Sequence, residues 1–422
     1  MPLFKEYHLH LPDFLLEKSK QMKFLYVVRI LRDLVNKIAL FFLPVFLFQM
    51  GNNQAAFFNA NQNFIRLSDF QWGMVVLAGY FLLYRVIVFI LVIPVAQVIK
   101  KKGLARVLTY GLLAYIVLFS LLMGSTQYFW FIIPAAIADG VQTALFWTPY
   151  HVILARSIKK KQMGRGLGAI QFFVQLVGVV APAIAGATIF LFGYSFIYLL
   201  SAALVLLSII CSLHITNEQV DEHVSLNKMK EWLKRPLFRK LVISFVGKYI
   251  NDATIVVWPL YVFLILGTVD KVGYIYSISL FIAMILSLFI GSYIDHHKEK
   301  KLYFASGGVL SLLWVARIAV TNVWSVVVVD TIERFSANFH WLFFDAKLIK
   351  DGKGSQALSF FSFRELLISF TAIIFWLVFL LIFLFFNSWN ILFVLAAVGV
   401  ILSLLVTDSI GKQVEQIEYK KL

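Results

Sequence analysis

Residues 72–103 read WGMVVLAGYFLLYRVIVFILVIPVAQVIKKKG, an apolar run that ends in three lysines and a glycine. A bilayer core of about 30 Å requires about 20 residues of helix per crossing, and only a backbone that satisfies its own hydrogen bonds can cross it. Similar runs, separated by short turns, fill most of the chain from Leu34 to Val406. Because 61% of the 422 residues are hydrophobic and the mean hydropathy is +0.84, the sequence predicts an all-α polytopic membrane protein with about 12 transmembrane helices.

The positive charge is concentrated in alternate turns. The formal net charge is +16, and thirty of the 38 Lys and Arg lie before Asp33, in every second turn, or in the tail. The intervening turns hold only Arg66 and Lys271. Under the positive-inside rule this pattern places both termini in the cytoplasm and requires an even number of spans. Basic residues spread over several short turns share no folded surface, so the charge does not indicate a nucleic-acid partner.

The N-terminal segment and the cysteine content limit the class further. Residues 1–33 are charged and contain Pro2 and Pro12, so no cleavable signal peptide is visible, and we expect a multi-pass protein of the plasma or inner membrane. The single cysteine, Cys211, lies in an apolar span and allows neither a disulfide framework nor a cysteine metal site. We expect no cofactor and no bound metal.

The apolar runs predict two sets of six spans. The first set lies at about 34–50, 72–98, 104–123, 128–154, 166–191 and 194–213, and the second at about 241–266, 272–294, 302–321, 323–346, 356–385 and 389–407. The corresponding regions are a cytoplasmic or interfacial segment 1–33, an N-terminal bundle 34–213, a linker 214–240, a C-terminal bundle 241–407 and a cytoplasmic tail 408–422. In the linker, Leu226, Met229 and Trp232 recur at helical spacing among lysines, which predicts an amphipathic helix on the inner leaflet.

The two halves are similar to each other in the fourth span of each. When span 128–154 is placed on span 323–346, Asp139 aligns with Asp330 and Arg156 aligns with Lys347 at one constant offset. Internal repeats of this kind are typical of secondary transporters.

The end of the predicted eighth span carries a recognisable motif. It reads Gly291, Ser292, Tyr293, Ile294 and Asp295, followed by Lys298, Lys300 and Lys301. A glycine, three residues, an aspartate and a basic turn resemble the signature of the major facilitator superfamily. The copy expected after the second span is eroded, with Pro94 and Val98 in place of the glycine and the aspartate.

Two further spans resemble the same family in part. In the fifth span the residues Gly178, Ala181, Pro182, Ala185 and Gly186 are similar to the Gly-Pro-rich motif of the family's antiporters. Ordinary close packing of helices is the alternative explanation of these small residues. In the fourth span Gly140 and Ala144 fit another family motif, whose arginine position is occupied by Ala136.

The resemblance implies a fold and a gate. It implies two pseudo-symmetric six-helix bundles, in which the first, fourth, seventh and tenth helices line a central cavity while the third, sixth, ninth and twelfth face lipid. It also places Asp295 across the interface from the start of the fifth helix, so that Gly291, Asp295 and Arg165 would form an inner gate. Because the motifs are partial, neither the substrate nor the coupling ion follows from the resemblance.

Charged residues inside the predicted spans fit that arrangement. Each costs about 2.5–3.5 kcal/mol or more in a bilayer, so each is expected to face a cavity or a partner. The charges on spans expected to line the cavity are Asp139 in the fourth, Lys248 and Asp252 in the seventh, and Asp330, Glu333 and Arg334 in the tenth. Arg317 is an exception, because it lies in the ninth span, which is expected to face lipid. Neighbouring residues that could line the same cavity are Trp147, Tyr150, His151, Asn251 and Trp258.

The spacing of these charges leaves two interpretations open. Lys248 and Asp252 share a helix face, and the charges could be neutralised structural pairs, such as Arg334 with Glu333. Alternatively, an acid without a partner could bind a proton or a cationic solute, because burial favours the uncharged form of a carboxyl group. Three more charged residues lie inside predicted spans rather than in the turns, and they are interpreted as locks between helices: Arg85, Arg364 and Glu365.

The function that the sequence favours is a secondary active transporter that moves a small organic solute by alternating access, with proton coupling preferred. The alternatives are a uniporter and a transporter-like sensor or scaffold that moves no solute. A membrane-embedded enzyme is least expected, since the chain has no HExxH site, no Walker A loop and no G-x-S-x-G elbow. The expected partners are the lipid bilayer, a small-molecule solute and protons. The sequence leaves the substrate, the direction of transport and the oligomeric state open.

Overall fold

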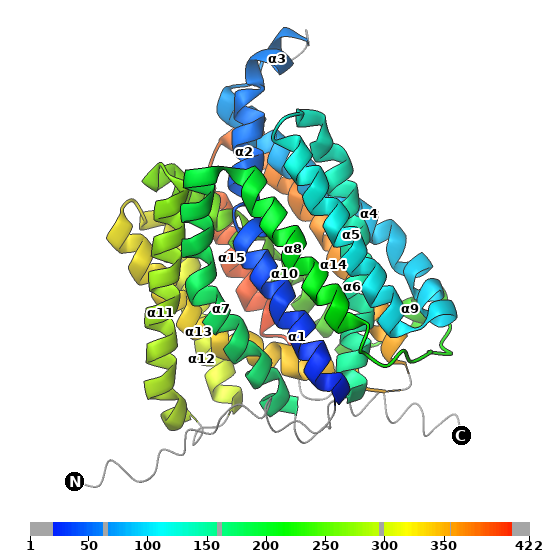
Figure 1. The fold of residues 1–422 in the computed structure, drawn as a ribbon. Helices are drawn as coiled ribbons and strands as arrows, with labels where there is room; N and C mark the ends of the chain where they lie inside the picture. Colours follow the sequence, from blue (N-terminus) through cyan, green and yellow to red (C-terminus); the bar gives the residue numbers. More distant parts are fainter. Residues whose placement is uncertain (1–19, 62–65, 158–162, 295–298, 355, 407–422) are drawn as a thin grey trace, which may run out of the picture.

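Helices make up nearly all of the described chain. The computed structural model describes residues 20–61, 66–157, 163–294, 299–354 and 356–406, and no strand occurs within these ranges. The helices of the first half are α1 (Lys20–Val35), α2 (Leu43–Asn53), α3 (Ala55–Ala60), α4 (Asp69–Lys102), α5 (Leu104–Ser125), α6 (Ile132–Ser157), α7 (Met163–Phe192) and α8 (Tyr194–Ser212). The linker forms α9 (Leu226–Leu233), and the second half forms α10 (Pro236–Leu266), α11 (Val269–Ile294), α12 (Glu299–Ala316), α13 (Val323–Asp351), α14 (Ala357–Leu381) and α15 (Trp389–Ser403). The long helices run side by side between the two ends of the molecule (Figure 1).

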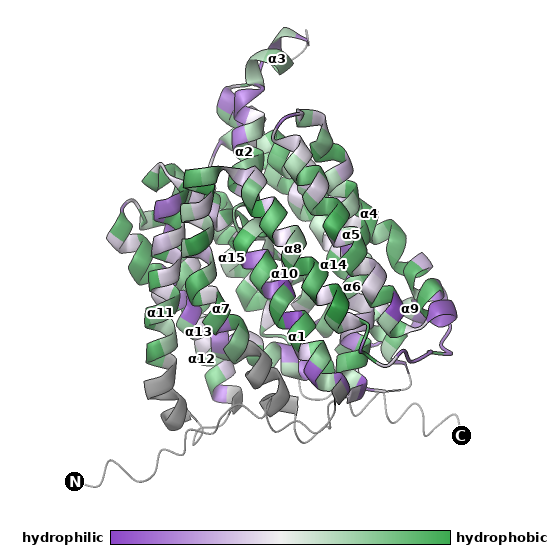
Figure 2. Ribbon diagram, viewed as in Figure 1, coloured by the Kyte–Doolittle hydropathy of each residue, from purple (hydrophilic) through white to green (hydrophobic). Residues whose placement is uncertain are grey.

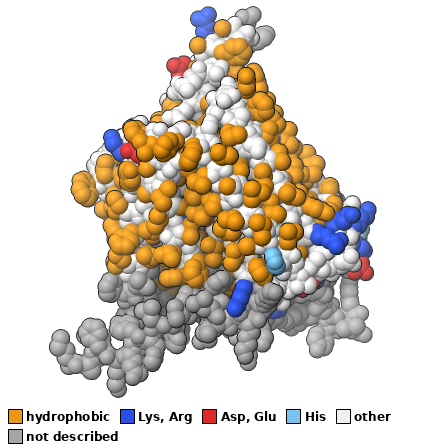
Figure 3. Space-filling model, in the orientation of Figure 1, with side chains coloured by type: hydrophobic (Ala, Val, Ile, Leu, Met, Phe, Trp, Pro, Cys, Tyr) orange, Lys and Arg blue, Asp and Glu red, His pale blue; other side chains and the backbone are white. Residues whose placement is uncertain are grey.

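Ten of the described helices are long and apolar enough to cross a membrane. Hydrophobic side chains cover the middle of the molecule in Figure 3, and the ribbons of Figure 2 are hydrophobic over the same height. Two predicted spans are not among the ten, because α13 carries several charged residues and α15 is an apolar helix of 15 residues. The chain is therefore a polytopic helical protein, and the count of twelve spans stays a prediction.

The first membrane helix begins earlier than predicted. The expected interfacial segment 1–33 is described only from Lys20 onward, and from there it forms helix α1. Apolar residues of α1, such as Leu25 and Val28, are fully buried against the rest of the protein. The predicted start at Leu34 was wrong because charged residues interrupt the apolar pattern although the helix continues through them.

A π-helix joins α1 to α2. It comprises Asn36–Leu40, and its characteristic bond runs from the backbone N–H of Phe41 to the carbonyl of Asn36 at 2.8 Å. Together these segments make one candidate span, Gln21–Asn53, of 33 residues. The π-helix therefore occupies the middle of the first membrane helix.

The two halves meet mainly along two helix pairs, α4 with α14 and α7 with α11. In the second pair, a Cβ atom placed on Gly186 would lie 2.7 Å from the carbonyl oxygen of Val269, and one placed on Gly273 would lie 2.3 Å from that of Pro182. A side chain at either position would not fit between these backbones. These glycines of the fifth and eighth predicted spans thus allow the two halves to pack closely.

The linker helix α9 packs on the second half. Its Met229 is buried, and the ring of Trp232 has its centroid 5.5 Å from that of Phe238 in α10 and 6.1 Å from that of Phe363 in α14. The apolar face of the predicted amphipathic helix therefore covers α10 and α14.

The residues before α9 connect the two halves. The side-chain amide of Asn217 donates to the carbonyl of Lys102, beside the turn between α4 and α5, at 2.9 Å. The carboxylate of Glu222 accepts bonds of 2.9 Å from the backbone N–H groups of Leu358 and Ser359 at the start of α14, where free N–H groups favour an anion.

An exposed ion pair adds to this connection. Lys100, at the end of α4, lies 2.6 Å from Asp221, and its hydrogen bond and charge lower the pKa of that carboxyl group. The segment around residues 217–222 thus contacts the first half at one end and α14 of the second half at the other.

Candidate functional site

Asp139 lies on α6 in a buried hydrogen-bond network. Its Oδ2 accepts a bond of 3.1 Å from the hydroxyl of Tyr80 on α4, and its Oδ1 accepts one of 2.7 Å from the side-chain amide of Gln142. The Oε1 atom of Gln142 in turn accepts a bond of 2.6 Å from Arg32 on α1. Among the ion pairs of the described residues none includes Asp139, so its charge is balanced by hydrogen bonds and by the more distant Arg32 and Arg85.

The first helix contributes two arginines that the sequence had assigned to the cytoplasm. Arg29 forms an ion pair of 2.7 Å with Asp33, and its guanidinium lies 4.7 Å from the centre of the Trp147 ring. Arg32 is buried, with its guanidinium 3.9 Å from the centre of the Phe146 ring. Such cation–π contacts are worth about 2 kcal/mol when the cation is desolvated. The apolar residues before position 29 recur at helical spacing. This pattern could have indicated that the membrane helix includes both arginines.

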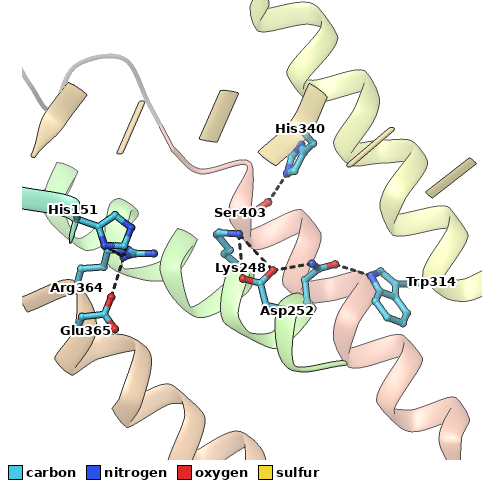
Figure 4. A network of polar contacts seen from close by, with 9 residues as sticks. His151, Lys248, Asp252, Trp314, His340, Arg364, Glu365 and Ser403 are labelled. Carbon is cyan, nitrogen blue, oxygen red and sulfur yellow. Dashed lines mark hydrogen bonds and ion pairs between the residues drawn. The ribbon is translucent and has the colours of Figure 1, made fainter. Parts of the chain in front are cut away.

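Lys248 and Asp252 form the predicted pair on α10. The ammonium of Lys248 lies 3.1 Å from Oδ2 of Asp252, and Asn251 donates to Asp252 at 3.2 Å (Figure 4). Asn251 also accepts a bond of 2.8 Å from the indole of Trp314 on α12.

The Lys248–Asp252 pair is accessible. The side chain of Asp252 is 46% exposed and that of Lys248 is 17% exposed. The ammonium of Lys248 also lies 4.4 Å from the centre of the Trp341 ring on α13, so the pair faces other helices rather than lipid alone. Both charges are therefore partly exposed at the protein surface.

Asp330 of α13, by contrast, is enclosed. Its carboxylate lies 3.5 Å from Arg317 and 3.7 Å from Arg334, and it accepts a bond of 2.8 Å from the indole of Trp258. The side chains of Asp330 and Arg317 are each only 1% exposed. Arg317, the exception in the predicted charge map, is thus a direct partner of Asp330.

The suggested pair of Arg334 with Glu333 does not form. Arg334 instead pairs with Asp330, one turn away on the same helix face. Glu333 takes part in no ion pair within the described part of the chain, although Arg317 and Arg334 lie close enough to attract it electrostatically.

His151 of α6 contacts the second half. A ring nitrogen of His151 lies 3.4 Å from the guanidinium of Arg364 on α14 (Figure 4). The His151 ring also stacks on that of Phe361, with 5.3 Å between the ring centroids. Arg364 also forms an ion pair of 2.9 Å with its neighbour Glu365. We expected these two adjacent charges to have partners on neighbouring helices. Arg364 contacts His151 of α6, and Glu365, besides its pair with Arg364, attracts Arg85 of α4 electrostatically.

The predicted residue Tyr150 and a further histidine, His340, are packed inside the protein. Tyr150 is buried and stacks on Phe146 at 5.6 Å between ring centroids. His340 is fully buried, with its ring nitrogens next to the carbonyl of Tyr303 and the hydroxyl of Ser403 (Figure 4). Its place between α12 and α15 leaves no surface for a solute.

The predicted acids belong to separate networks. Asp139 is linked to α1 and α4, Asp330 is linked to α10 and α12, and Asp252 is the accessible one of the three. The arginine that pairs with Asp330, Arg317, lies in the 3-10 helix Arg317–Ala319 directly after α12. The convergence of the three acids on one cavity stays a prediction. In the part of the chain that the structure describes, no three His, Cys, Asp or Glu side chains are grouped as metal ligands would be.

The predicted inner gate lies largely outside the described residues. Asp295 itself is not described, and Gly291 and Arg165 are placed only as parts of helices α11 and α7. The gate therefore stays a prediction.

Comparisons with known proteins identify the family. The family model of the Major Facilitator Superfamily matches residues 25–330. No curated protein sequence matches the chain significantly.

Two solved structures show the shared fold. The human organic anion transporter MFSD10 (TETRAN) is similar with a TM-score of 0.65 at 12% identity, over 92% of this chain and 99% of the other. A variant of the fucose:proton symporter FucP of E. coli is similar with a TM-score of 0.59 at 12% identity, over 91% of this chain and 97% of the other.

Proposed function

Since the chain belongs to the major facilitator superfamily, we propose that it is a secondary active transporter that moves a small organic solute across the membrane by alternating access, with proton coupling. The two halves, each with six predicted spans, would rock about the interface of α4 with α14 and α7 with α11. The names of the two similar structures, an organic anion transporter and a proton symporter, support transport of a small organic solute.

The observation that carries the proton coupling is the environment of Asp139. It is a buried carboxylate held by two hydrogen bonds and by no ion pair of the described residues. Such a group can take up a proton without breaking a salt bridge, whereas Asp330 would lose its contacts with Arg317 and Arg334. Acidic residues inside membrane helices often belong to proton relays in pumps and transporters. We therefore propose Asp139 as the coupling acid.

The accessible pair Lys248–Asp252 is the proposed second element of the site. Its exposure allows contact with a solute, and its two opposite charges allow contact with either a positive or a negative group of that solute. Trp341 beside Lys248 offers an aromatic wall for an organic group.

The experiment that tests this function is solute uptake by proteoliposomes. Candidate solutes are first selected by thermal shift of the purified protein, because a ligand of the folded state raises its stability. A proton gradient should then drive accumulation of a selected solute above its outside concentration. Uptake that stops at equal concentrations with or without the gradient would identify a uniporter, and no uptake of any bound solute would favour the sensor or scaffold.

We also propose that both termini lie in the cytoplasm and that residues 52–71 form the largest outer loop. On a Cys211→Ser background, Ala60→Cys in α3 and Asn227→Cys in α9 place single thiols at exposed positions on the two predicted sides. A membrane-impermeant maleimide added to intact cells should label Ala60→Cys and leave Asn227→Cys unlabelled until the membrane is opened. The opposite labelling pattern would invert the proposed topology.

A further inference from the structure

Lys37 occupies the centre of the first membrane helix. It is the midpoint of the candidate span Gln21–Asn53, and it belongs to the π-helix Asn36–Leu40. π-Helices are rare and are frequent at functional sites. An ammonium group at this depth is costly unless it has a counter-ion or a water-filled surrounding.

Among the described residues, the ammonium of Lys37 forms no ion pair. Three other bases of the interior are paired with acids, namely Arg29 with Asp33, Lys248 with Asp252, and Arg334 with Asp330, while Arg32 has a hydrogen bond to Gln142 and aromatic contacts instead. No hydrogen bond or ion pair of the described residues involves the side chain of Lys37. Asp33, one turn earlier on α1, attracts the ammonium electrostatically, but its carboxylate forms its ion pair with Arg29.

Room for this side chain is provided by α7. A Cβ atom placed on Gly178 would lie 2.8 Å from Nζ and 3.1 Å from Cε of Lys37. The same Cβ would lie 3.4 Å from a methyl group of Leu280 on α11, so the ammonium lies where the first half meets the second. Gly178 was singled out in the sequence as part of a motif, and the structure shows that its lack of a side chain accommodates Lys37.

A second cation approaches from the other half. Arg334 of α13 lies within electrostatic range of Lys37 and repels its ammonium, as does Arg29 of α1, whereas Asp33 attracts it. The guanidinium of Arg334 lies 3.4 Å from the centre of the Tyr276 ring, and its Nε has no hydrogen-bond partner. The Tyr276 ring in turn contacts that of Phe41, next to the π-helix, at 4.2 Å between centroids. Two cations and two aromatic rings, one of each from each half, therefore surround the same region.

We propose that this region binds the anionic group of an organic solute, with Lys37 and Arg334 as its direct contacts and the rings of Tyr276 and Phe41 against its apolar part. A carboxylate or sulfonate between the two cations would replace their repulsion by two charge-assisted bonds. The depth of Lys37 favours a free solute over an anionic lipid, whose headgroup stays at the membrane surface. This inference rests on the proposed function and names the substrate class of the transporter.

Occupancy of the site would also link the two halves. Lys37 belongs to the first half and Arg334 to the second, so an anion that contacts both binds best when the halves are close at this depth. A ligand shifts a conformational equilibrium only by such a difference in affinity between states.

The inference is tested by thermal shift of the purified protein with benzene derivatives that are similar in shape and differ in charge. Benzoate and benzenesulfonate should raise the melting temperature, whereas benzylammonium and benzyl alcohol at the same concentration should not. The measurement is made in zwitterionic lipid, and a second arm with phosphatidylglycerol vesicles detects competition by an anionic lipid. If benzylammonium or benzyl alcohol stabilises the protein as much as benzoate does, the anion site is refuted.

Substitutions of Lys37 separate a binding role from a structural one. Lys37→Gln should weaken benzoate binding at least tenfold without lowering the melting temperature of the ligand-free protein, since it removes an unpaired charge. Lys37→Arg should keep most of the binding, and Lys101→Gln, at the exposed end of α4, should behave as wild type. Unchanged benzoate binding in Lys37→Gln, or loss of stability without anion, would overturn the proposal.

The inference and the proposed function can fail separately. If anions bind through Lys37 but no bound solute crosses the membrane, the transport function fails and the site stands. If the protein accumulates a neutral or cationic solute and benzoate does not bind, the transport function stands and the anion site fails.

Discussion

Asp139→Asn should abolish proton-driven accumulation of solute in proteoliposomes while leaving exchange of solute across the membrane. The amide keeps a side chain of the same shape between Tyr80 and Gln142, but it cannot take up or release a proton. If one proton moves with each solute, loss of the coupling acid removes the driving force and retains the path. A gradient of one pH unit supports about a tenfold concentration ratio, which is about 1.4 kcal/mol, and this ratio should fall to one.

The controls for Asp139→Asn replace acids in other surroundings, one exposed and one paired with two arginines. Asp221→Asn removes an exposed carboxylate outside the membrane and should accumulate solute as wild type. Asp330→Asn should reduce stability rather than remove coupling, because Asp330 is paired with two arginines. If Asp139→Asn, Asp252→Asn and Asp330→Asn all accumulate solute normally, proton coupling through these residues is wrong.

Arg317→Gln should cause the largest loss of stability of any single substitution considered for this protein. Arg317 is buried, lies 3.5 Å from Asp330 and has its guanidinium 3.8 Å from the centre of the Trp314 ring. Its removal leaves Asp330 with Arg334 as its one ion-pair partner among the described residues, and breaking a buried pair from one side costs about 3–5 kcal/mol. Thermal unfolding of the purified protein should show a correspondingly lower melting temperature.

A double-mutant cycle checks that this loss comes from the ion pair. Asp330→Asn added to Arg317→Gln removes the unbalanced acid, so the double variant should be more stable than Arg317→Gln alone, with a coupling of about 0.5–3 kcal/mol. Arg317→Lys is the matched variant that keeps the charge and loses the flat contact with the tryptophan rings. Additive effects of the two substitutions would show that Arg317 acts through packing and not through Asp330.

The class of the fold could be predicted from the sequence because each membrane helix is recognisable from the apolar pattern of its own residues. Apolar runs of the required length marked ten helices that the structure also places, and the spacing of Lys248 and Asp252 predicted a pair that forms. Both signals depend only on residues within one helix. The resemblance to a family at Gly291–Asp295 likewise needed one short stretch, and the family model supports it.

The errors came from charges whose partners lie on other helices. Arg29, Arg32 and Lys37 were taken as the end of a cytoplasmic segment or left unexplained, because a helix that carries three bases does not look apolar enough to enter a membrane. Aromatic rings of α6 and an acid one turn away compensate two of them. The ring contacts exist only once the helices are packed, whereas the Arg29–Asp33 pair lies within α1.

The same reason explains the networks of the acids. Arg317 and Asp330 lie on different helices, and nothing in the spacing of either helix indicates that they meet. Glu222 caps α14 from the linker across a long separation in sequence. Such pairings depend on the tertiary structure, and the spacing of residues in a single sequence does not predict them.

The central claim is that the two halves alternate between two arrangements around the interior charges. Distances between spin labels test it without knowledge of the solute. One pair, Lys101→Cys with Lys350→Cys, joins the ends of α4 and α13 on the predicted inner side, and another, Met123→Cys with Trp324→Cys, joins the end of α5 and the start of α13 on the predicted outer side. All four positions are exposed, and Cys211→Ser removes the native thiol. Pulsed electron spin resonance in nanodiscs should show two distances for each pair, and a change from alkaline to acidic pH should lengthen one pair as it shortens the other. A single distance for each pair that does not respond to pH or to a bound solute would contradict alternating access coupled to protons.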